Sequence, residues 1–242
     1  MDFTSLYSTR IQTTYDDDQA TIFKTFGDKY SAKDGSKVIL TNYYKGLPVA
    51  YPATIIGLDR DNLDLDVNPQ QAVAIESDRY TLIRSKLFPD PIIAHVQYVN
   101  VKKHAVSVNK FGFVEVLAEK RGAVRLNLDP PVTATIQLQD QAIDGQLVDI
   151  STQGLAVTVD YFVEVESGTD VSVKFMLPDP VMVKDTLIKV LARLVNIEDS
   201  ASPYHYKFKT SPERHQEQLI SRYIFQRQVD IIRGLKEEVE IG

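Results

Sequence analysis

The second half of the chain contains several short segments in which apolar and polar residues alternate. They lie at about 134–138, 155–159, 171–177 and 204–208. Because successive side chains of a β-strand point to opposite faces, this alternation predicts strands with one face in a core and the other in water. Short strands at such close spacing are typical of a closed antiparallel barrel. The pattern therefore favours a small closed β-barrel in this half of the chain.

The period of the pattern changes near the C-terminus. Ser211 can cap a helix and Pro212 can occupy its first turn. From there to about Glu237, apolar residues recur near one side of the predicted helix: Leu219, Ile220, Tyr223, Ile231, Ile232 and Leu235. We expect a terminal helix that packs through this stripe, on the barrel or on a partner.

Residues 1–35 are predicted to be a polar lead-in followed by a short helix. The acidic run Asp16–Asp18 precedes an apolar patch at Ile22, Phe23 and Phe26. Nothing in this segment suggests chemistry.

The remaining chain divides into three parts by pattern. Residues 36–108 contain short β-like runs separated by turn residues, which predict a first antiparallel barrel or sandwich. Residues 109–120 mix polar and apolar positions and are interpreted as an interdomain connector, which makes 121–242 the second domain. The predicted fold is mainly β, with two small barrels and a C-terminal helix.

Composition narrows the class of function. The chain has 242 residues, enough for two modest cores, and a net charge of −6, which disfavours a general nucleic-acid partner. It has no cysteine, which excludes disulfides, thiol nucleophiles and thiolate metal sites and favours a reducing compartment. With no secretory signal and no long apolar run, we expect a cytoplasmic protein that does not insert into a membrane.

Two short motifs carry the candidate chemistry. They are Arg121-Gly-Ala-Val-Arg125 and Asp149-Ile-Ser151-Thr-Gln-Gly154. Two arginines four residues apart project to the same side of an extended strand, or rise from a loop entering it. A guanidinium matches the O6/N7 edge of guanine, forks onto phosphate oxygens and stacks on purines. The pair therefore predicts a guanine nucleotide as ligand.

The second motif is predicted to form the bend between two strands. Asp149 can accept hydrogen bonds from guanine N1 and N2, and Ser151 can donate to a phosphate oxygen or a base atom. Gly154 can take a positive φ or let a ligand approach closely. Lys120 beside Arg121 is either a further phosphate contact or a solvated residue, and both interpretations stay open.

Together the two motifs resemble the signature of the PilZ family, Arg-x-x-x-Arg followed after a few tens of residues by Asp/Asn-x-Ser-x-x-Gly. The resemblance covers about residues 118–235 and implies a six-stranded barrel with a C-terminal helix that binds cyclic di-guanylate (cyclic di-GMP). One departure is that the strand Tyr204–Phe208 lacks the glycine often found there. The implied ligand-binding residues are Arg121, Arg125, Asp149, Ser151 and Gly154, with Lys120 in addition.

The two-domain layout resembles the flagellar-brake proteins of that family. This implies a receptor, not an enzyme, that couples binding at the connector and barrel to a change in domain arrangement. The implied partner is a protein such as the flagellar motor or another envelope or regulatory component, with recruitment to the flagellar basal body and a role in motility. No metal or cofactor is implied besides the ligand, cyclic di-GMP.

Three other classes of function compete with this interpretation, of which a small RNA-binding barrel is disfavoured by the negative charge and the absence of a basic aromatic face. Each motif alone is common as a solvated face or an ordinary strand connection. A protein-interaction module with a degenerate, non-binding barrel is therefore the alternative. An enzyme ranks below both, because no nucleophile with a base, no metal-ligand spacing and no phosphate-binding glycine loop is found.

Overall fold

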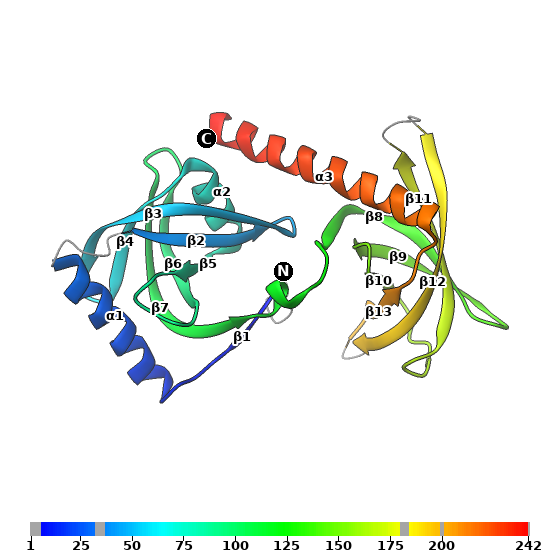
Figure 1. Ribbon diagram of the computed structural model, residues 1–242, viewed down its shortest axis with the longest axis horizontal. Coiled ribbons are helices and arrows are strands. Elements are labelled where there is room, and N and C mark those ends of the chain that lie inside the picture. The colour runs from blue at the N-terminus through cyan, green and yellow to red at the C-terminus, as the bar shows by residue number, and fades with distance from the viewer. Residues whose placement is uncertain (1–5, 32–36, 180–183, 199–200, 242) are drawn as a thin grey trace. The chain divides into compact units, whose positions relative to one another are not determined.

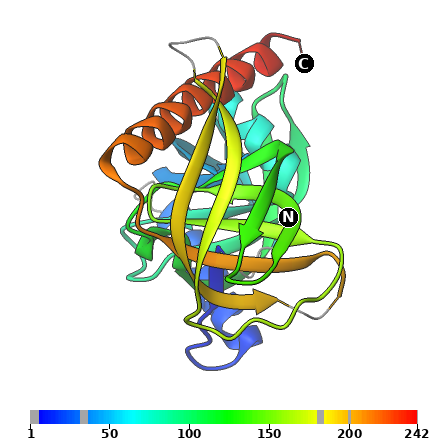
Figure 2. The ribbon, with the colours of Figure 1, turned by 90° about the vertical axis from the view of Figure 1, so that its right-hand side faces the viewer.

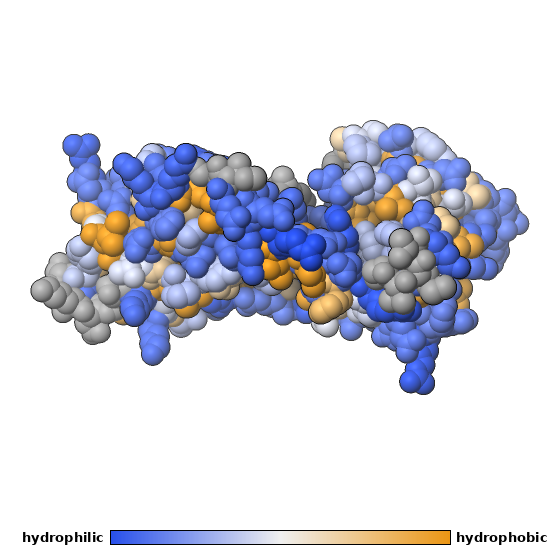
Figure 3. Space-filling model, turned by 90° about the horizontal axis from the view of Figure 1, so that it is seen from above, coloured by the Kyte–Doolittle hydropathy of each residue, from blue (hydrophilic) through white to orange (hydrophobic). Residues whose placement is uncertain are grey.

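The computed structural model describes residues 6–31, 37–179, 184–198 and 201–241 (Figure 1). The chain forms two compact units: a first unit of residues 1–121 and 232–242, and a second unit of residues 122–231. Both are built mainly from antiparallel strands, as the alternating pattern predicts. On the face seen in Figure 3 the surface is largely hydrophilic, and hydrophobic residues are visible in smaller groups among the hydrophilic ones.

The first unit is a β-barrel with two helices. Its sheet has the order β1-β7-β4-β3-β2-β5-β6, and β6 also pairs with β7, so β2 to β7 close into a ring of six strands. Of the two forms predicted, barrel or sandwich, the structure has the barrel. The elements are β1 (Tyr7–Thr9), α1 (Tyr15–Ser31), β2 (Lys37–Tyr44), β3 (Leu47–Asp59), β4 (Asn62–Asp66), α2 (Pro69–Asp78), β5 (Tyr80–Arg84), β6 (Ile92–Asn100), β7 (Ala105–Val116) and the 3-10 turn η2 (Leu117–Lys120).

Helix α1 confirms the helix predicted near the N-terminus. Ile22 and Phe26 are fully buried in the barrel's core, and the Phe26 ring lies 5.1 Å from that of Phe88 in an edge-on arrangement. Helix α2 was not predicted. It starts where Asn68 caps the backbone N–H of Gln70, with Pro69 in the first turn.

The second unit is the predicted six-stranded barrel, closed in the order β10-β13-β12-β11-β8-β9 (Figure 1, Figure 2). The inward residues follow the predicted alternation; Leu155, Val157 and Val159, for example, are all at most 3% exposed. Its strands are β8 (Leu126–Gln137), β9 (Ala142–Ile150), β10 (Gly154–Val159), β11 (Asp170–Asp179), β12 (Lys184–Glu198) and β13 (Tyr204–Thr210). Helix α3 (Arg214–Ile241) follows them, and its residues from 232 onward belong to the first unit.

Helix α3 is the predicted terminal helix. It begins at Arg214 and continues to Ile241, a few residues beyond the predicted end. Of its predicted stripe, Ile232 is 47% exposed, whereas Leu219, Ile220, Tyr223, Ile231 and Leu235 are buried. Among the described residues, no helix has the length and apolar character needed to cross a membrane.

The structure corrects the position of the connector. Residues 109–116, assigned to it from the sequence, are the second half of β7. Phe111 and Phe113 enter the barrel core, while Val114 and Val116 pack into a second cluster with Leu6 and other residues. Because both faces of this part of β7 are covered, its sequence does not alternate, and no strand could be recognised. The non-regular link between the units is limited to about 121–125.

The first barrel contains a buried network of hydrogen bonds centred on Asn42, whose side chain is fully buried. Its Nδ2 donates to Asp78 Oδ2 (3.0 Å) and to the carbonyl oxygen of Tyr80 (2.7 Å). Its Oδ1 accepts from Gln71 Nε2 (2.7 Å) and Thr81 Oγ1 (2.8 Å). Burial raises the pKa of the Asp78 carboxyl, so this group depends on the network for its hydrogen bonds.

Replacing Asn42 with alanine should lower the free energy of unfolding by about 3 kcal/mol, since several buried polar groups lose their partner together. Urea denaturation of the parent and of Asn42→Ala measures the difference. The exposed Asn196 on β12 supplies the control, and Asn196→Ala should unfold with the parent. Equal losses in the two variants would mean that the network adds nothing specific.

Candidate ligand-binding site

The second motif lies where β9 turns into β10. Strand β10 is central here, paired with β9 on one side and β13 on the other. Ala156 of β10 is opposite Asp149 of β9 and opposite Lys207 of β13. By alternation with the inward Leu155 and Val157, all three residues belong to the outer face of the barrel. The candidate site is thus on the wall of the barrel and not in its core.

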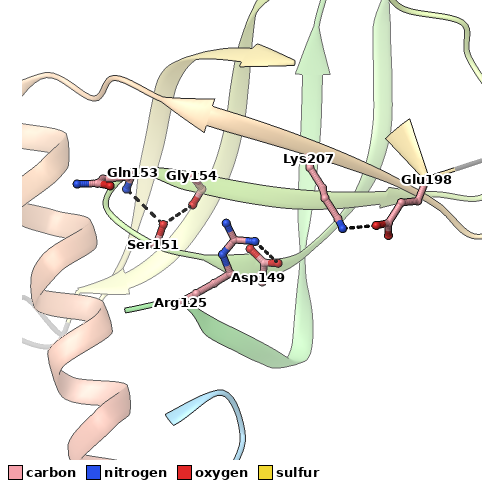
Figure 4. A network of polar contacts seen from close by, with 7 residues as sticks. All are labelled: Arg125, Asp149, Ser151, Gln153, Gly154, Glu198 and Lys207. Atoms are coloured by element: carbon pink, nitrogen blue, oxygen red, sulfur yellow. Dashed lines mark hydrogen bonds and ion pairs between the residues drawn. The ribbon is translucent and has the colours of Figure 1, made fainter. Parts of the chain in front are cut away.

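The Asp149–Gly154 segment is a tight turn held by its own serine. The carbonyl oxygen of Gly154 accepts from the Ser151 backbone N–H (2.8 Å) and from Ser151 Oγ (3.0 Å). Ser151 Oγ accepts in turn from the Gln153 N–H (3.3 Å), as Figure 4 shows. The hydroxyl is buried and satisfied inside the turn. Ser151 therefore determines the shape of the turn in this structure.

Gly154 is required by the neighbouring strand. Its φ is not positive, unlike that of Gly46 or Gly168, so the first of the two reasons predicted for a glycine does not apply. A β carbon at this position would lie 2.7 Å from the carbonyl oxygen of Phe208 on β13. Close backbone approach of β13 leaves room for no side chain.

Arg125 and Asp149 form the charged centre of the site. Arg125 Nη1 lies 3.7 Å from Asp149 Oδ2, and the two side chains are 33% and 17% exposed. Arg125 directly precedes β8, whose Asn127 is opposite Asp149, and this register brings the two motifs together (Figure 4). A loose, partly exposed ion pair of this kind adds little to stability. Asp149 Oδ1 is itself buried.

Lys120 and Arg121 belong to the first unit. Lys120 Nζ lies 2.7 Å from Glu115 Oε1 in an exposed ion pair, and its hydrogen bond holds the pKa of Glu115 below its usual value. Burial raises the pKa of the Tyr43 hydroxyl. The positive charge of Arg121 partly offsets this rise. The second unit begins at Gly122, where an added β carbon would meet Gln153 Oε1 at 2.8 Å.

The structure brings together four of the six predicted residues within one unit: Arg125, Asp149, Ser151 and Gly154. Sequence reasoning missed two neighbours, Gln153 in the turn and Lys207 on β13. Lys207 forms an ion pair with Glu198 (Figure 4). Its place beside the motif follows from strand register, which no local pattern reveals. Within the described part of the chain, no group of three or more His, Asp or Glu side chains is arranged to hold a metal ion.

The sequence profile of the PilZ domain matches residues 119–226. A search of curated protein sequences gives no significant match. The region matched by the PilZ profile contains both motifs and all six strands of the second barrel.

Among solved structures, the chain resembles YcgR of Escherichia coli in complex with c-di-GMP, with 12% identity over 98% of this chain and 99% of that one, and a TM-score of 0.44. It also resembles the Bacillus subtilis inhibitor of motility MotI/DgrA, with 17% identity, 81% and 97% coverage and a TM-score of 0.43. The K. pneumonia MrkH–c-di-GMP complex gives 11% identity, 89% and 96% coverage and 0.42.

Gly154→Ala should destabilise the barrel by about 2 kcal/mol, because the new methyl group overlaps the Phe208 carbonyl oxygen. Gly234→Ala in α3 is the matched control. Nothing lies within 4 Å of its added β carbon, and alanine favours helix, so this variant should be more stable by about 1 kcal/mol. Thermal unfolding of both variants measures the shifts; a stabilised Gly154→Ala would contradict the close approach of β13.

Proposed function

We propose that this chain is a receptor for cyclic di-GMP and not an enzyme, and that residues 119–226, which match the PilZ model, form its PilZ domain. The observation that supports this most directly is the position of Arg125 beside Asp149 and the Ser151–Gly154 turn on one outer face of the barrel. A donor and an acceptor side by side form a pattern complementary to guanine.

The proposed roles follow from the hydrogen-bonding groups of the two side chains. Asp149 accepts from N1 and N2 of a guanine base, the two donors on its pairing edge. Arg125 donates to O6 and N7 or to a phosphate oxygen of the same ligand. Adenine has an acceptor at N1 and a donor at N6. Its N1 would face the acceptor Asp149, and its N6 would face the donor Arg125, so neither hydrogen bond can form.

Ser151 and Gly154 support the site through the turn. Because Ser151 Oγ bonds to the Gly154 carbonyl oxygen, the hydroxyl fixes the backbone that follows Asp149. Direct donation from Ser151 to the ligand requires its proton to rotate away from that carbonyl. Gly154 keeps β13 close and thereby keeps the turn at the edge of β10.

Lys120 and Arg121 are proposed to join the ligand on binding. Arg121 precedes Arg125 by only four residues, a span of at most about 14 Å of extended chain. Lys120 would exchange Glu115 for a phosphate, which costs little because the ion pair is exposed. Binding would then fix the link at 121–125 and change the arrangement of the two units, to the extent that the ligand binds one arrangement more tightly.

The proposed output is an altered surface offered to a protein partner. In the flagellar-brake interpretation this partner is the flagellar motor or another envelope or regulatory component. The receptor would then act in the cytoplasm, be recruited to the flagellar basal body and regulate motility.

One observation favours a second candidate, a protein-interaction module whose barrel does not bind the dinucleotide. Arg125 already has a carboxylate partner in Asp149, as a purely structural arginine would. This candidate predicts that cyclic di-GMP changes neither the stability nor the shape of the protein.

Isothermal titration of the purified protein should show saturable binding of cyclic di-GMP and none of cyclic di-AMP. Arg125→Ala should weaken binding about a hundredfold, the effect of losing charged hydrogen bonds to the ligand. The matched control is Arg193→Ala, which removes another arginine of this barrel that pairs with an aspartate, Asp170, at 2.7 Å. That variant should bind like the parent.

A folded parent that binds no cyclic di-GMP would leave the interaction module as the function. Binding that is equally weakened by Arg193→Ala would mean that general charge, and not the proposed site, holds the ligand.

A further inference from the structure

Lys207 lies in the same cross-strand row as Asp149, on the other side of β10. Ala156 separates them, since it is opposite Asp149 on β9 and opposite Lys207 on β13. Neighbouring strands are about 4.8 Å apart, so the two backbone positions are about 10 Å apart. The residue between them has only a methyl side chain, which is 2% exposed and is therefore covered by neighbouring groups.

The partner of Lys207 in this structure is Glu198, the last residue of β12. The two side chains are 31% and 43% exposed. Ion pairs with this exposure contribute about 0–1 kcal/mol, so an incoming anion can replace the carboxylate at low cost.

The position of Lys207 selects one part of the ligand. In guanine, O6 and N1 are neighbours on one edge, so a base whose N1 is bound by Asp149 presents its O6 beside that residue. Arg125 is already there. The phosphates are the acceptors of the ligand that lie farther from this edge, and an ammonium group binds phosphate as a compact point charge.

We propose that Lys207 is a further ligand-binding residue of this site. On binding, Lys207 breaks its ion pair with Glu198 and binds a phosphate oxygen of cyclic di-GMP. This inference rests on the proposed function. Asp149 and Arg125 hold the base on the β9 side of the row, and Lys207 holds a phosphate on the β13 side. Glu198 competes with that phosphate for Lys207.

The test is isothermal titration with cyclic di-GMP of the full chain and four variants. Lys207→Met should bind about tenfold more weakly, the loss expected for one charged hydrogen bond, and Lys207→Arg should recover most of the affinity. Glu198→Gln should bind more tightly than the parent because the competitor has lost its charge. Lys174→Met is the control: its lysine is similarly half-buried but lies on β11, opposite β10 in the barrel.

Thermal unfolding of every variant checks that the barrel is intact. Parent-like affinity of a folded Lys207→Met overturns the inference and leaves the proposed function standing. Loss of affinity that Lys207→Arg does not recover also overturns it, since the role is then one of packing and not of charge. If the parent itself binds no cyclic di-GMP, the proposed function fails first.

Discussion

Strand β10 is held so closely between its neighbours that two positions around it have no space for a β carbon. At Gly145 of β9 an added carbon would overlap the carbonyl oxygen of Thr158, and at Gly154 it would lie 2.7 Å from that of Phe208. With glycine at both positions, β9, β10 and β13 can approach closely within one sheet. The spacing and register of the three strands then decide which side chains share the outer face, and the candidate site is a consequence of that register.

The site combines rigid and adjustable parts. The turn after Asp149 is fixed by hydrogen bonds from Ser151 to Gly154, so the carboxylate has a defined position. The cations around it have partly exposed partners: Arg125 lies 3.7 Å from Asp149, and Lys207 pairs with the half-exposed Glu198. A dianionic ligand can recruit such groups without a large loss of folding energy, because exposed ion pairs are weak.

The sequence predicted the elements that depend on local pattern. Alternation predicted the second barrel, and the two motifs predicted Arg125 and Asp149 as neighbours. It failed where both faces of a strand are buried, as at Phe111 and Val114 of β7, which hid the strand inside the expected connector. The sequence also could not place Lys207 beside the motif, because that position arises from pairing between strands far apart in the chain. The start of α2 is marked by the capping pair Asn68-Pro69, which lies in a region where the sequence analysis predicts only strands and turns.

A backbone NMR titration with cyclic di-GMP tests the central claim most directly, since it locates the ligand residue by residue. The largest shifts should fall on the amides of 121–126, 149–156 and 206–208, with the inward positions of β11 unchanged. Cyclic di-AMP should shift none of these signals at the same concentration. Saturating shifts confined to other residues, or no shifts at all, would show that the outer face of β9, β10 and β13 is not the binding site.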